Sequence, residues 1–504
     1  MHPSNRTPVL VGIGTATRRE EDFTRALEPM DLMLEAVRAA GADTGSAATL
    51  GRVEYISVPR GRWKYANPAG EIARAIGARA TTVLSTPGVL QQALIGEACA
   101  RIARGEIGAA LVAGSDAGYR LLRAQIAGQK AGERVQDDEP DIFLQPKEEL
   151  RHAAEKRAGL VMPVALYAIL ESAFRAKHGW TVSAHRDRLA ELYSGLSRVA
   201  AQNPHAWNRN AIPAEAIRDA SDKNPMQAFP YTRFHCSTWN VDQAAALLFC
   251  SASLADELGI PRDKWIFPVA STESNHMVAV SARADLASCP GARVTGVAAL
   301  DAGALGIDQV DLVELYSCFP VAIETYAEAL AIPLTLTRLP TVNATGGAGA
   351  SAPTVTGGMA FAGGPYNNYF LQATCRAAEL LRQGAGRNAL LSCVSGVITK
   401  QAFGLWSREA PPRGFVHLDL SDQVARETEA RDVLEEFTGV ARVAGYTILH
   451  GRGQLPKGIA LVDTSDGKRA LVTTGDQALI ASMQETELVG VQVSVAANTL
   501  TAIG

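Results

Sequence analysis

The chain has 504 residues, of which 47% are hydrophobic and 20% are charged, with 48 Lys and Arg against 52 Asp and Glu. This is the composition of an ordinary globular protein with room for about three domains. The net charge of −4 is spread along the chain and no segment is strongly basic, so nucleic acid is not an expected partner.

The seven cysteines are odd in number, scattered along the chain, and never spaced as Cys-x-x-Cys. We therefore expect reduced thiols rather than a disulfide framework or a structural zinc site. No run of about 20 apolar residues could span a bilayer, and the amino terminus lacks a signal-peptide pattern. The sequence predicts a cytoplasmic protein with no membrane partner.

Strand and helix patterns alternate through the first 118 residues. Residues 8–18 are typical of a buried strand that leaves through a glycine-rich turn, and residues 31–45 follow at helical spacing with a glycine stop. Residues 51–61 indicate another strand. Residues 80–118 indicate a short strand, a Thr-Pro-Gly turn, a long apolar helix and a very apolar strand. This alternation predicts an α/β fold with a parallel sheet covered on both faces.

Residues 119–239 interrupt the rhythm with charged, helical and aromatic stretches, which predicts an inserted helical cap. Strand patterns then return at 265–274, 310–318 and 388–399. Two α/β halves of about 150 residues each would be the product of an internal duplication. We expect one half at 1–118 and 240–270, and the other half at 271–409.

A Pro-rich linker, "EAPPRG" at 409–414, precedes a run of short strand patterns. One of them reads as a hairpin with Ser-Asp-Gly at its turn. We predict a separate small β domain over 410–504, shaped like an oligonucleotide-binding (OB) barrel but without a basic and aromatic face. Its expected role is contact with another domain or a partner.

Two glycine-rich segments are candidate binding loops. "GIGTAT" at 12–17 lacks the third glycine and the well-placed acidic residue of a dinucleotide loop, so we expect a tight strand exit and no NAD. The segment 343–369 could turn tightly and offer bare N–H groups to a ligand oxygen. We favour a binding loop there over a spacer without a ligand.

Few residues have an obvious catalytic pattern. None of the nine histidines falls in a pair with metal-ligand spacing, so we expect no metal, and no Gly-x-Ser-x-Gly elbow occurs. Cys318 and Cys393 both end strand-like runs, where a thiol could face a ligand. The alternative for each is a small buried hydrophobic side chain, which is the commoner place of a free cysteine.

Several ordered blocks resemble the thiolase superfamily, in particular its acetyl-CoA acetyltransferase-like branch with an added carboxy-terminal domain. The resemblance covers about residues 8–407, and the tail matches the added domain. It implies two βαβαβαββ halves in five layers, αβαβα, with coenzyme A as substrate or ligand, and a homodimer. The blocks are "VLVGIG", "ARGEIGAALVAGSDA", "PYTRFHCSTWNVDQAAALLFCS", "VELYSCFP", "TGGMAFAGGPYNNY" and "CVSGVITKQAFG".

The resemblance also implies where a thiolase would carry its catalytic groups. The nucleophilic cysteine of a thiolase corresponds to about Gly88, with Ser85 as a nearby hydroxyl, so the acyl-enzyme route looks lost. The histidine of the Gly-His-Pro motif corresponds to Gly364. The acid/base cysteine survives as Cys393, and the glycine of that motif shifts to Gly396.

The loop Tyr316-Ser317-Cys318-Phe319 corresponds to the thiolase oxyanion loop, with Tyr316 in the key place. Some thiolase-like lyases use one tyrosine in this loop and another just beyond the glycine-rich loop, where Tyr369 follows Asn368. A tyrosine with its ordinary pKa is a poor base at neutral pH but a good hydrogen-bond donor to an oxyanion. Ser317, Cys318 and Asn368 are expected to contact the substrate.

Three functions follow from this resemblance. The first is a CoA-dependent acyltransferase or retro-Claisen enzyme without an acyl-enzyme, in which Cys393 is the base and Tyr316 and amides near Gly88 hold the thioester oxygen. The second is a retro-aldol lyase that cleaves a 3-hydroxyacyl-CoA through Tyr316 and Tyr369. The third is a non-catalytic carrier of acyl-CoA or lipid. The expected partner is an acyl-CoA, or a 3-keto or 3-hydroxy acid, of undetermined acyl group.

Overall fold

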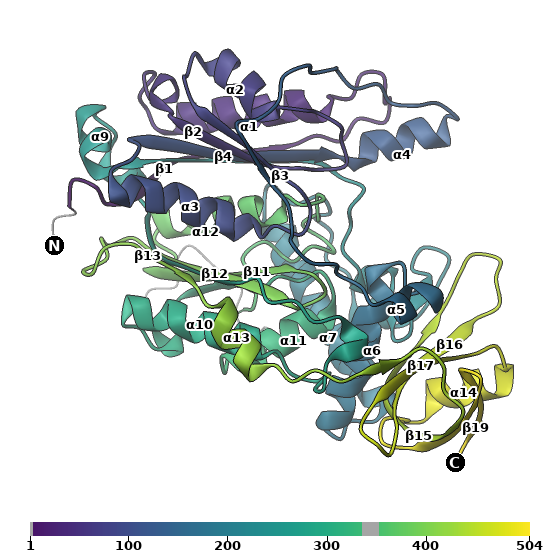
Figure 1. Cartoon of the computed structure of the whole chain (residues 1–504). Coiled ribbons are helices and arrows are strands. Elements are labelled where there is room, and N and C mark those ends of the chain that lie inside the picture. Colours follow the sequence, from purple (N-terminus) through teal and green to yellow (C-terminus); the bar gives the residue numbers. More distant parts are fainter. Residues whose placement is uncertain (1–3, 335–351) are drawn as a thin grey trace.

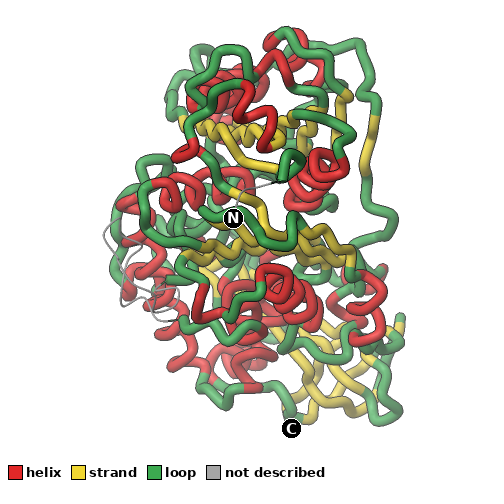
Figure 2. Tube along the Cα trace, turned by 90° about the vertical axis from the view of Figure 1, so that its left-hand side faces the viewer, coloured by secondary structure: helices red, strands yellow, loops and turns green. Residues whose placement is uncertain are grey.

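The computed structural model describes residues 4–334 and 352–504 of the chain. Two sheets lie one above the other, with helices above, between and below them, so that five layers alternate (Figure 1). Figure 2 shows the same stack from the side, with the small β domain at its lower end. The expected αβαβα arrangement is therefore present.

The first sheet contains six strands of mixed direction, not the all-parallel sheet that the alternation predicts. β8 is antiparallel to both of its neighbours, because it arrives from the inserted segment without a crossover helix. All residues of β4 and β8 are buried, as expected for strands covered on both faces. In order across the sheet, the strands are β1 (Pro8–Thr17), β8 (Asp242–Ser251), β4 (Ala109–Ala117), β2 (Tyr55–Pro59), β3 (Thr81–Ser85) and β5 (Ile142–Leu144).

The second sheet repeats the arrangement of the first. The order β9-β12-β11-β10 matches β1-β8-β4-β2, with the same sequence of antiparallel and parallel pairings. This shared topology displays the predicted duplication. The strands are β9 (Phe267–Ser274), β10 (Leu312–Glu314), β11 (Asn388–Ser395), β12 (Lys400–Ser407) and β13 (Val416–Asp419).

One layer of helices lies between the two sheets and packs against both. α3 contacts β4 above and β9 below, while α12 contacts β8 and β11 (Figure 1). α1 and α2 cover the outer face of the first sheet, and α10, α11 and α13 cover the second. The bounds are α1 (Pro29–Asp43), α2 (Pro68–Ile76), α3 (Gln91–Arg104), α10 (Pro290–Gly303), α11 (Pro320–Ala329), α12 (Tyr369–Arg382) and α13 (Ser421–Glu427).

The glycines of "GIGTAT" lie inside β1 and not in a turn, which corrects the predicted strand exit. A Cβ on Gly12 would stand 2.2 Å from the carbonyl oxygen of Ala40, and one on Gly14 would stand 2.0 Å from that of Ala36. Because residues two apart on a strand share one face, both glycines let α1 approach the sheet closely. They serve packing rather than phosphate binding.

The inserted segment is largely helical, as expected, but its ends join other parts of the molecule. β5 extends the first sheet, and β6 (Met226–Ala228) and β7 (Tyr231–Thr232) join the sheet of the β domain. No helix in the described ranges is both long and apolar enough to cross a membrane. The helices of the segment are α4 (Gly118–Ile126), α5 (Ala153–Arg157), α6 (Pro163–Lys177), α7 (Val182–Gln202) and α8 (Ala214–Arg218).

The carboxy-terminal domain is a closed five-stranded barrel, as predicted. Each strand pairs with two others in the ring β15-β16-β17-β19-β18-β15, and a helix, α14 (Gln477–Glu485), lies between β17 and β18 along the chain. The ring strands are β15 (Gly439–Leu449), β16 (Lys457–Asp463), β17 (Arg469–Thr474), β18 (Gln492–Ala496) and β19 (Thr499–Ile503).

The second sheet extends past the boundary expected at residue 410. β13 pairs with β9, so the Pro-rich linker connects two strands of one sheet and not two domains. The strands of the β domain begin after α13, with β14 (Val433–Leu434) against β17. A Pro-rich stretch marks a break in regular structure, and such a break occurs within a domain as readily as between two.

A buried arginine attaches the barrel to the inserted segment. Arg175 on α6 has a side chain only 1% exposed, and it donates to Glu487 at 2.6 Å and to the Tyr446 hydroxyl at 2.8 Å. The Tyr446 N–H in turn donates to the Ser172 hydroxyl at 2.8 Å. The guanidinium, the carboxylate and the hydroxyl are therefore all hydrogen-bonded at this contact, which fixes the barrel against α6.

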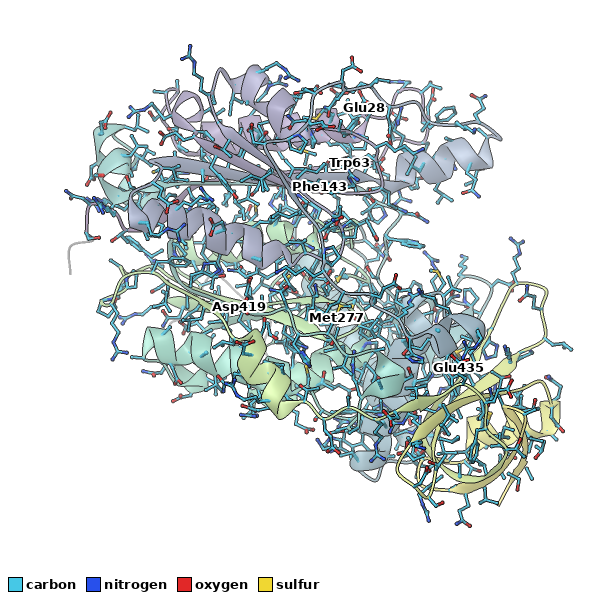
Figure 3. The ribbon with its side chains drawn as sticks, in the orientation of Figure 1. Glu28, Trp63, Phe143, Met277, Asp419 and Glu435 are labelled. Atoms are coloured by element: carbon cyan, nitrogen blue, oxygen red, sulfur yellow. The ribbon has the colours of Figure 1, made fainter. Side chains whose placement is uncertain are left out.

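We expect Arg175→Ala to lower the free energy of unfolding by about 2–3 kcal/mol, because a partly buried carboxylate and a buried hydroxyl both lose a charged donor. Arg157→Ala is the matched control. Its pair with Glu435 also joins the inserted segment to the β domain, but at 3.8 Å and exposed to solvent (Glu435 is labelled in Figure 3). The control should cost at most about 1 kcal/mol. Urea denaturation measures both, and equal losses would contradict the assignment.

Candidate functional site

One large cavity, about 1080 Å³ in volume, opens where the two α/β halves meet the inserted segment. The loop before α3, the β10–α11 loop, the loop before α12 and the β11–β12 turn all reach it. Met277, labelled in Figure 3, lines it from the loop after β9. The residues predicted from sequence that line this cavity are Gly88, Tyr316, Cys318, Gly364 and Gly396.

Tyr316 lies in the cavity wall directly after β10. Its N–H donates to the Ser392 hydroxyl of β11 at 2.8 Å, and its ring meets the Tyr369 ring edge-on, with centroids 5.6 Å apart. Burial raises the pKa of Tyr316 well above its ordinary value, while a hydrogen bond from Gln91 acts in the opposite direction. The hydroxyl is therefore neutral at physiological pH and can donate to a ligand oxygen.

Gly88, the residue that the resemblance aligns with a nucleophile, lies in the loop before α3. Its φ of +105° favours glycine, and a Cβ there would stand 2.8 Å from Cγ of Pro146. Its carbonyl accepts from Nζ of the buried Lys400 at 3.1 Å. A side chain is excluded at this position, and a buried cation holds the loop in place.

At Gly364, which the resemblance aligns with a histidine, an added side chain would displace the hydroxyl of Ser237. A Cβ there would stand 2.0 Å from Oγ of Ser237, which also lines the cavity. The Gly364 N–H donates to the Thr238 carbonyl at 2.8 Å, so the backbone is held close to this strand-like stretch. Ser237 occupies the space that a histidine would need, and sequence reasoning did not identify it.

Cys393 is fully buried on β11 and is not among the residues that line the cavity. Burial raises the pKa of its thiol to about 12, although the first N–H groups of α3, those of Gln91 and Gln92, act to lower it. A thiol in this state is a poor base at neutral pH. The structure therefore gives the predicted acid/base role of Cys393 no geometric support.

Tyr369 points away from the cavity into a buried polar cluster. Its hydroxyl donates to Glu314 at 2.5 Å and lies 2.7 Å from the Thr356 hydroxyl. Glu314 also accepts from the N–H groups of Val355 and Thr356, at 2.8 and 3.0 Å. This cluster anchors the glycine-rich segment to β10, and Tyr369 contributes to that anchor rather than to the cavity wall.

Tyr366, three residues before Tyr369, does line the cavity and is 37% exposed. The reason lies in the backbone between the two tyrosines. Asn367 has a φ of +55°, which turns the chain sharply before α12 begins at Tyr369. A sequence alone does not show on which side of such a turn each ring falls.

The other predicted residues lie behind the cavity wall. Ser317 accepts from the Met359 N–H at 2.9 Å and supports the loop. Ser85 and Asn368 are fully buried, and none of their side-chain polar atoms has a partner among the described residues. The part of the glycine-rich segment at 343–351 lies outside the described residues.

Aromatic and cationic side chains gather around the rest of the cavity. Trp239 lines it with 43% of its surface exposed. Arg19 lies over the rings of Tyr119 and Trp207, 5.5 Å from each centroid, and all three also line the cavity. Arg233 and Lys147 add positive charge, next to Glu148 and Glu149. The aromatic stretches of the inserted segment were the only pattern in the sequence from which this part of the cavity wall could have been predicted.

No protein-family model matches the chain. A monomeric SCP2-thiolase-like protein type 1 from Mycobacterium smegmatis has a similar structure, with a TM-score of 0.80, 26% identity, and coverage of 99% of this chain and 100% of that one. An Ltp2–ChsH2(DUF35) aldolase matches at a TM-score of 0.58 and 17% identity, over 80% of this chain and 98% of that one. Human mitochondrial 3-ketoacyl-CoA thiolase, solved in complex with CoA, matches at a TM-score of 0.52 and 15% identity, over 81% of this chain and 100% of that one. The predicted resemblance is confirmed: the chain has a thiolase-like fold.

We expect Gly364→Ala to lower the free energy of unfolding by about 1–3 kcal/mol, because its Cβ overlaps Oγ of Ser237. In a Ser237→Ala background the same change should cost much less, since the remaining Cβ at position 237 would be 3.3 Å away. A double-mutant cycle measured by chemical denaturation checks this coupling. Additive effects would mean that the hydroxyl does not fill the space.

The two cysteines that line the cavity, Cys236 and Cys318, should not react with thiol reagents in the native protein. Burial raises the pKa of each thiol to about 12, so only about one thiol in 10,000 is ionised at pH 8. Titration with Ellman's reagent should show slow labelling in the native state and seven fast thiols in denaturant, since all seven cysteines are free. One fast thiol in the native state would contradict this assignment.

Proposed function

We propose that the protein binds an acyl-CoA or a closely related acyl thioester in the cavity described above. The position of Tyr316 carries this proposal: a neutral hydroxyl, held in the cavity wall near the Gly88 loop, is placed to donate to a thioester oxygen. Human mitochondrial 3-ketoacyl-CoA thiolase, which shares the fold, has been solved with CoA. Binding of this kind needs no activated nucleophile.

The chemistry of the cavity fits both ends of such a ligand. Phe319, Tyr167 and Met359 offer an apolar surface to an acyl chain. The exposed indole of Trp239 can stack on an adenine ring, and Arg19 or Arg233 can pair with phosphate groups. A volume of about 1080 Å³ is at the upper end of the usual range for ligand pockets, as a long cofactor requires.

Catalysis through an acyl-enzyme has little support from this geometry. Gly88 replaces the nucleophile, Gly364 leaves no space for a histidine, and Cys393 is buried with a raised pKa. No histidine is among the residues that line the cavity in the described ranges. Acyl transfer directly to CoA, without an acyl-enzyme, would rely on Cys393 as base, and it ranks behind binding because that thiol is buried with a raised pKa and does not line the cavity.

A retro-aldol lyase is the second candidate, because two tyrosines line the same cavity. These are Tyr316 and Tyr366, not Tyr316 and Tyr369 as the sequence suggested. In the reaction, the 3-hydroxyl of a 3-hydroxyacyl thioester would pass its proton through the Tyr366 hydroxyl to water, the C2–C3 bond would break, and C3 would leave as the carbonyl carbon of an aldehyde or ketone. The enolate left behind would be stabilised by the Tyr316 hydroxyl until a proton arrives at C2. The Ltp2–ChsH2(DUF35) aldolase shares the fold.

The proposed assembly differs from the predicted homodimer. The similar mycobacterial protein is described as monomeric, so the predicted homodimer gains no support from that comparison. We infer that the barrel, bound through Arg175 to the inserted segment, supplies a β domain within the chain. The OB type of this barrel and a cytoplasmic location stay predictions.

We expect the protein to bind an acyl-CoA, and Tyr316→Phe to weaken that binding about 2- to 12-fold, the equivalent of one hydrogen bond of 0.5–1.5 kcal/mol. Affinity for free CoA, which has no thioester oxygen, should not change. Tyr326→Phe is the matched control, because it removes another buried tyrosine hydroxyl that does not line the cavity. Isothermal titration calorimetry with octanoyl-CoA and CoA measures both affinities for the wild type and for each variant.

Equal weakening of both ligands by Tyr316→Phe would overturn the role of its hydroxyl, and no binding of either would overturn the proposed function. Mass spectrometry after incubation with 3-hydroxyacyl-CoA separates the candidates. A shorter acyl-CoA formed together with a ketone or aldehyde, without added CoA, would favour the lyase. A shorter acyl-CoA from a 3-ketoacyl-CoA that requires free CoA would favour acyl transfer, and an unchanged ester would leave binding as the function.

A further inference from the structure

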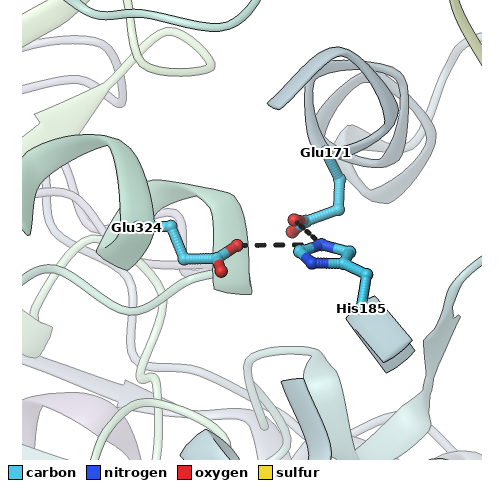
Figure 4. Close-up of side chains that lie close together, drawn as sticks. All are labelled: Glu171, His185 and Glu324. Atoms are coloured by element: carbon cyan, nitrogen blue, oxygen red, sulfur yellow. Dashed lines mark hydrogen bonds and ion pairs between the residues drawn. The ribbon is translucent and has the colours of Figure 1, made fainter. Parts of the chain in front are cut away.

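Three fully buried side chains meet beneath the cavity, outside the site described above. They are Glu171 on α6, His185 on α7 and Glu324 on α11 (Figure 4). The His185 Nε2 lies 2.6 Å from one oxygen of Glu171 and 4.0 Å from Oε2 of Glu324. One ligand atom from each residue falls within 4.8 Å of the other two. The spacing of these residues along the chain follows no metal-binding motif.

Two carboxylates in a buried site need a compensating positive charge or a shared proton. Glu171 is well satisfied, because the Tyr231 hydroxyl donates to it at 2.5 Å and His185 contacts its other oxygen. Glu324 is not: its Oε2 is buried and has no hydrogen-bond partner among the described residues. A proton shared between Glu324 and Glu171 would satisfy this oxygen, and so would a cation bound by both carboxylates and the imidazole.

Two further unpaired polar atoms lie on the side of Tyr231, which donates to Glu171 and whose ring is 6.1 Å from that of His235. The hydroxyl of Tyr193 and Nε2 of His235 are buried without a partner among the described residues, and their rings lie 5.2 Å apart. Buried polar atoms without partners are uncommon, and several together are typical of a site that holds an ion or water.

We propose that Glu171, His185 and Glu324 bind one divalent transition-metal ion, Zn²⁺, which cross-links α6, α7 and α11. An imidazole nitrogen and carboxylate oxygens are each ligands that this ion accepts. Two carboxylates and Zn²⁺ sum to zero charge, which makes the buried site electrically neutral. A water molecule would supply the fourth ligand.

The ligand atoms need only small movements. Ligand atoms at roughly 2.0–2.2 Å from Zn²⁺ in a tetrahedron lie roughly 3.3–3.5 Å from one another. The separations of 2.6 and 4.0 Å each differ from that spacing by less than about 1 Å. The ring of Trp180 stacks on His185 at 5.2 Å and holds its plane. Nδ1 of His185 has no partner among the described residues, whether or not an ion is bound.

The site would act on the cavity through two short connections. α11 begins directly after the loop that carries Tyr316, so an ion at Glu324 holds that helix against the inserted segment. Tyr231, which donates to Glu171, stacks on Phe319 with ring centroids 5.8 Å apart, and Phe319 lines the cavity. The proposed role is therefore structural: the ion fixes the wall on which the ligand rests.

The test is the metal content of the full-length, untagged protein, measured by inductively coupled plasma mass spectrometry after expression with added Zn²⁺. We expect about one Zn²⁺ per chain, lost in Glu324→Gln and retained in Glu155→Gln. Glu155 is the matched control, because it is also fully buried with one carboxylate oxygen that lacks a partner among the described residues. Glu324→Gln keeps the shape of the side chain, and its amide can still donate a hydrogen bond to Glu171. It therefore preserves the hydrogen-bonded pair but removes a carboxylate ligand.

Unfolding the wild type with a chelator and refolding it with Co²⁺ gives a second measurement that needs no variant. We expect visible absorption bands of a four-coordinate nitrogen and oxygen site, without the thiolate charge-transfer band that a cysteine ligand would add. The metal-free refolded protein should melt at a lower temperature than the Zn²⁺-refolded one. The proposal is overturned if the wild type holds no metal and refolds equally with or without Zn²⁺. It is also overturned if Glu324→Gln binds as much metal as the wild type.

Discussion

The shared middle layer of helices is the constraint on which the rest of this structure depends. α3 and α12 each pack against both sheets, so neither helix can move without opening two buried interfaces. Their amino-terminal ends reach the same cavity, through the Gly88 loop and the turn at Asn367. The close approach of β1 to α1 at Gly12 and Gly14 shows the same tight layering above them. The cavity is therefore built from loops that a rigid stack holds in place.

Two glycines line the cavity at the places that the resemblance aligns with catalytic groups of a thiolase. At Gly88 and Gly364 a side chain would overlap Pro146 and Ser237, respectively. Pro146 and Ser237 fill the space beside the places where the resemblance puts a nucleophile and a histidine, and the tyrosines that line the cavity there are Tyr316 and Tyr366. Hydrogen-bond donors of this kind can bind and polarise a carbonyl group, but they do not supply a nucleophile.

The inserted segment links the cavity to the remainder of the molecule. Its α6 carries Tyr167 in the cavity wall, Glu171 in the buried cluster and Arg175 in the contact with the barrel. These residues are four apart, so they lie along one side of the helix. Burial of Arg175 and Glu171 is tolerated because each meets groups that satisfy its charge, and such contacts restrict how the segment can lie. A shift of α6 at the cavity wall, the buried cluster or the barrel contact would therefore displace the other two.

The sequence by itself determined the alternating α/β halves, the barrel-like tail, and the absence of a cysteine at Gly88 and of a histidine at Gly364, because residue identity and hydrophobic period are local properties. Tertiary structure decided which groups face the ligand. The positive φ of Asn367 directs Tyr366 into the cavity and leaves Tyr369 on Glu314, and packing of β11 buries Cys393. Only packing brings Glu171, His185 and Glu324 together from separate helices, since no spacing along the chain encodes that meeting.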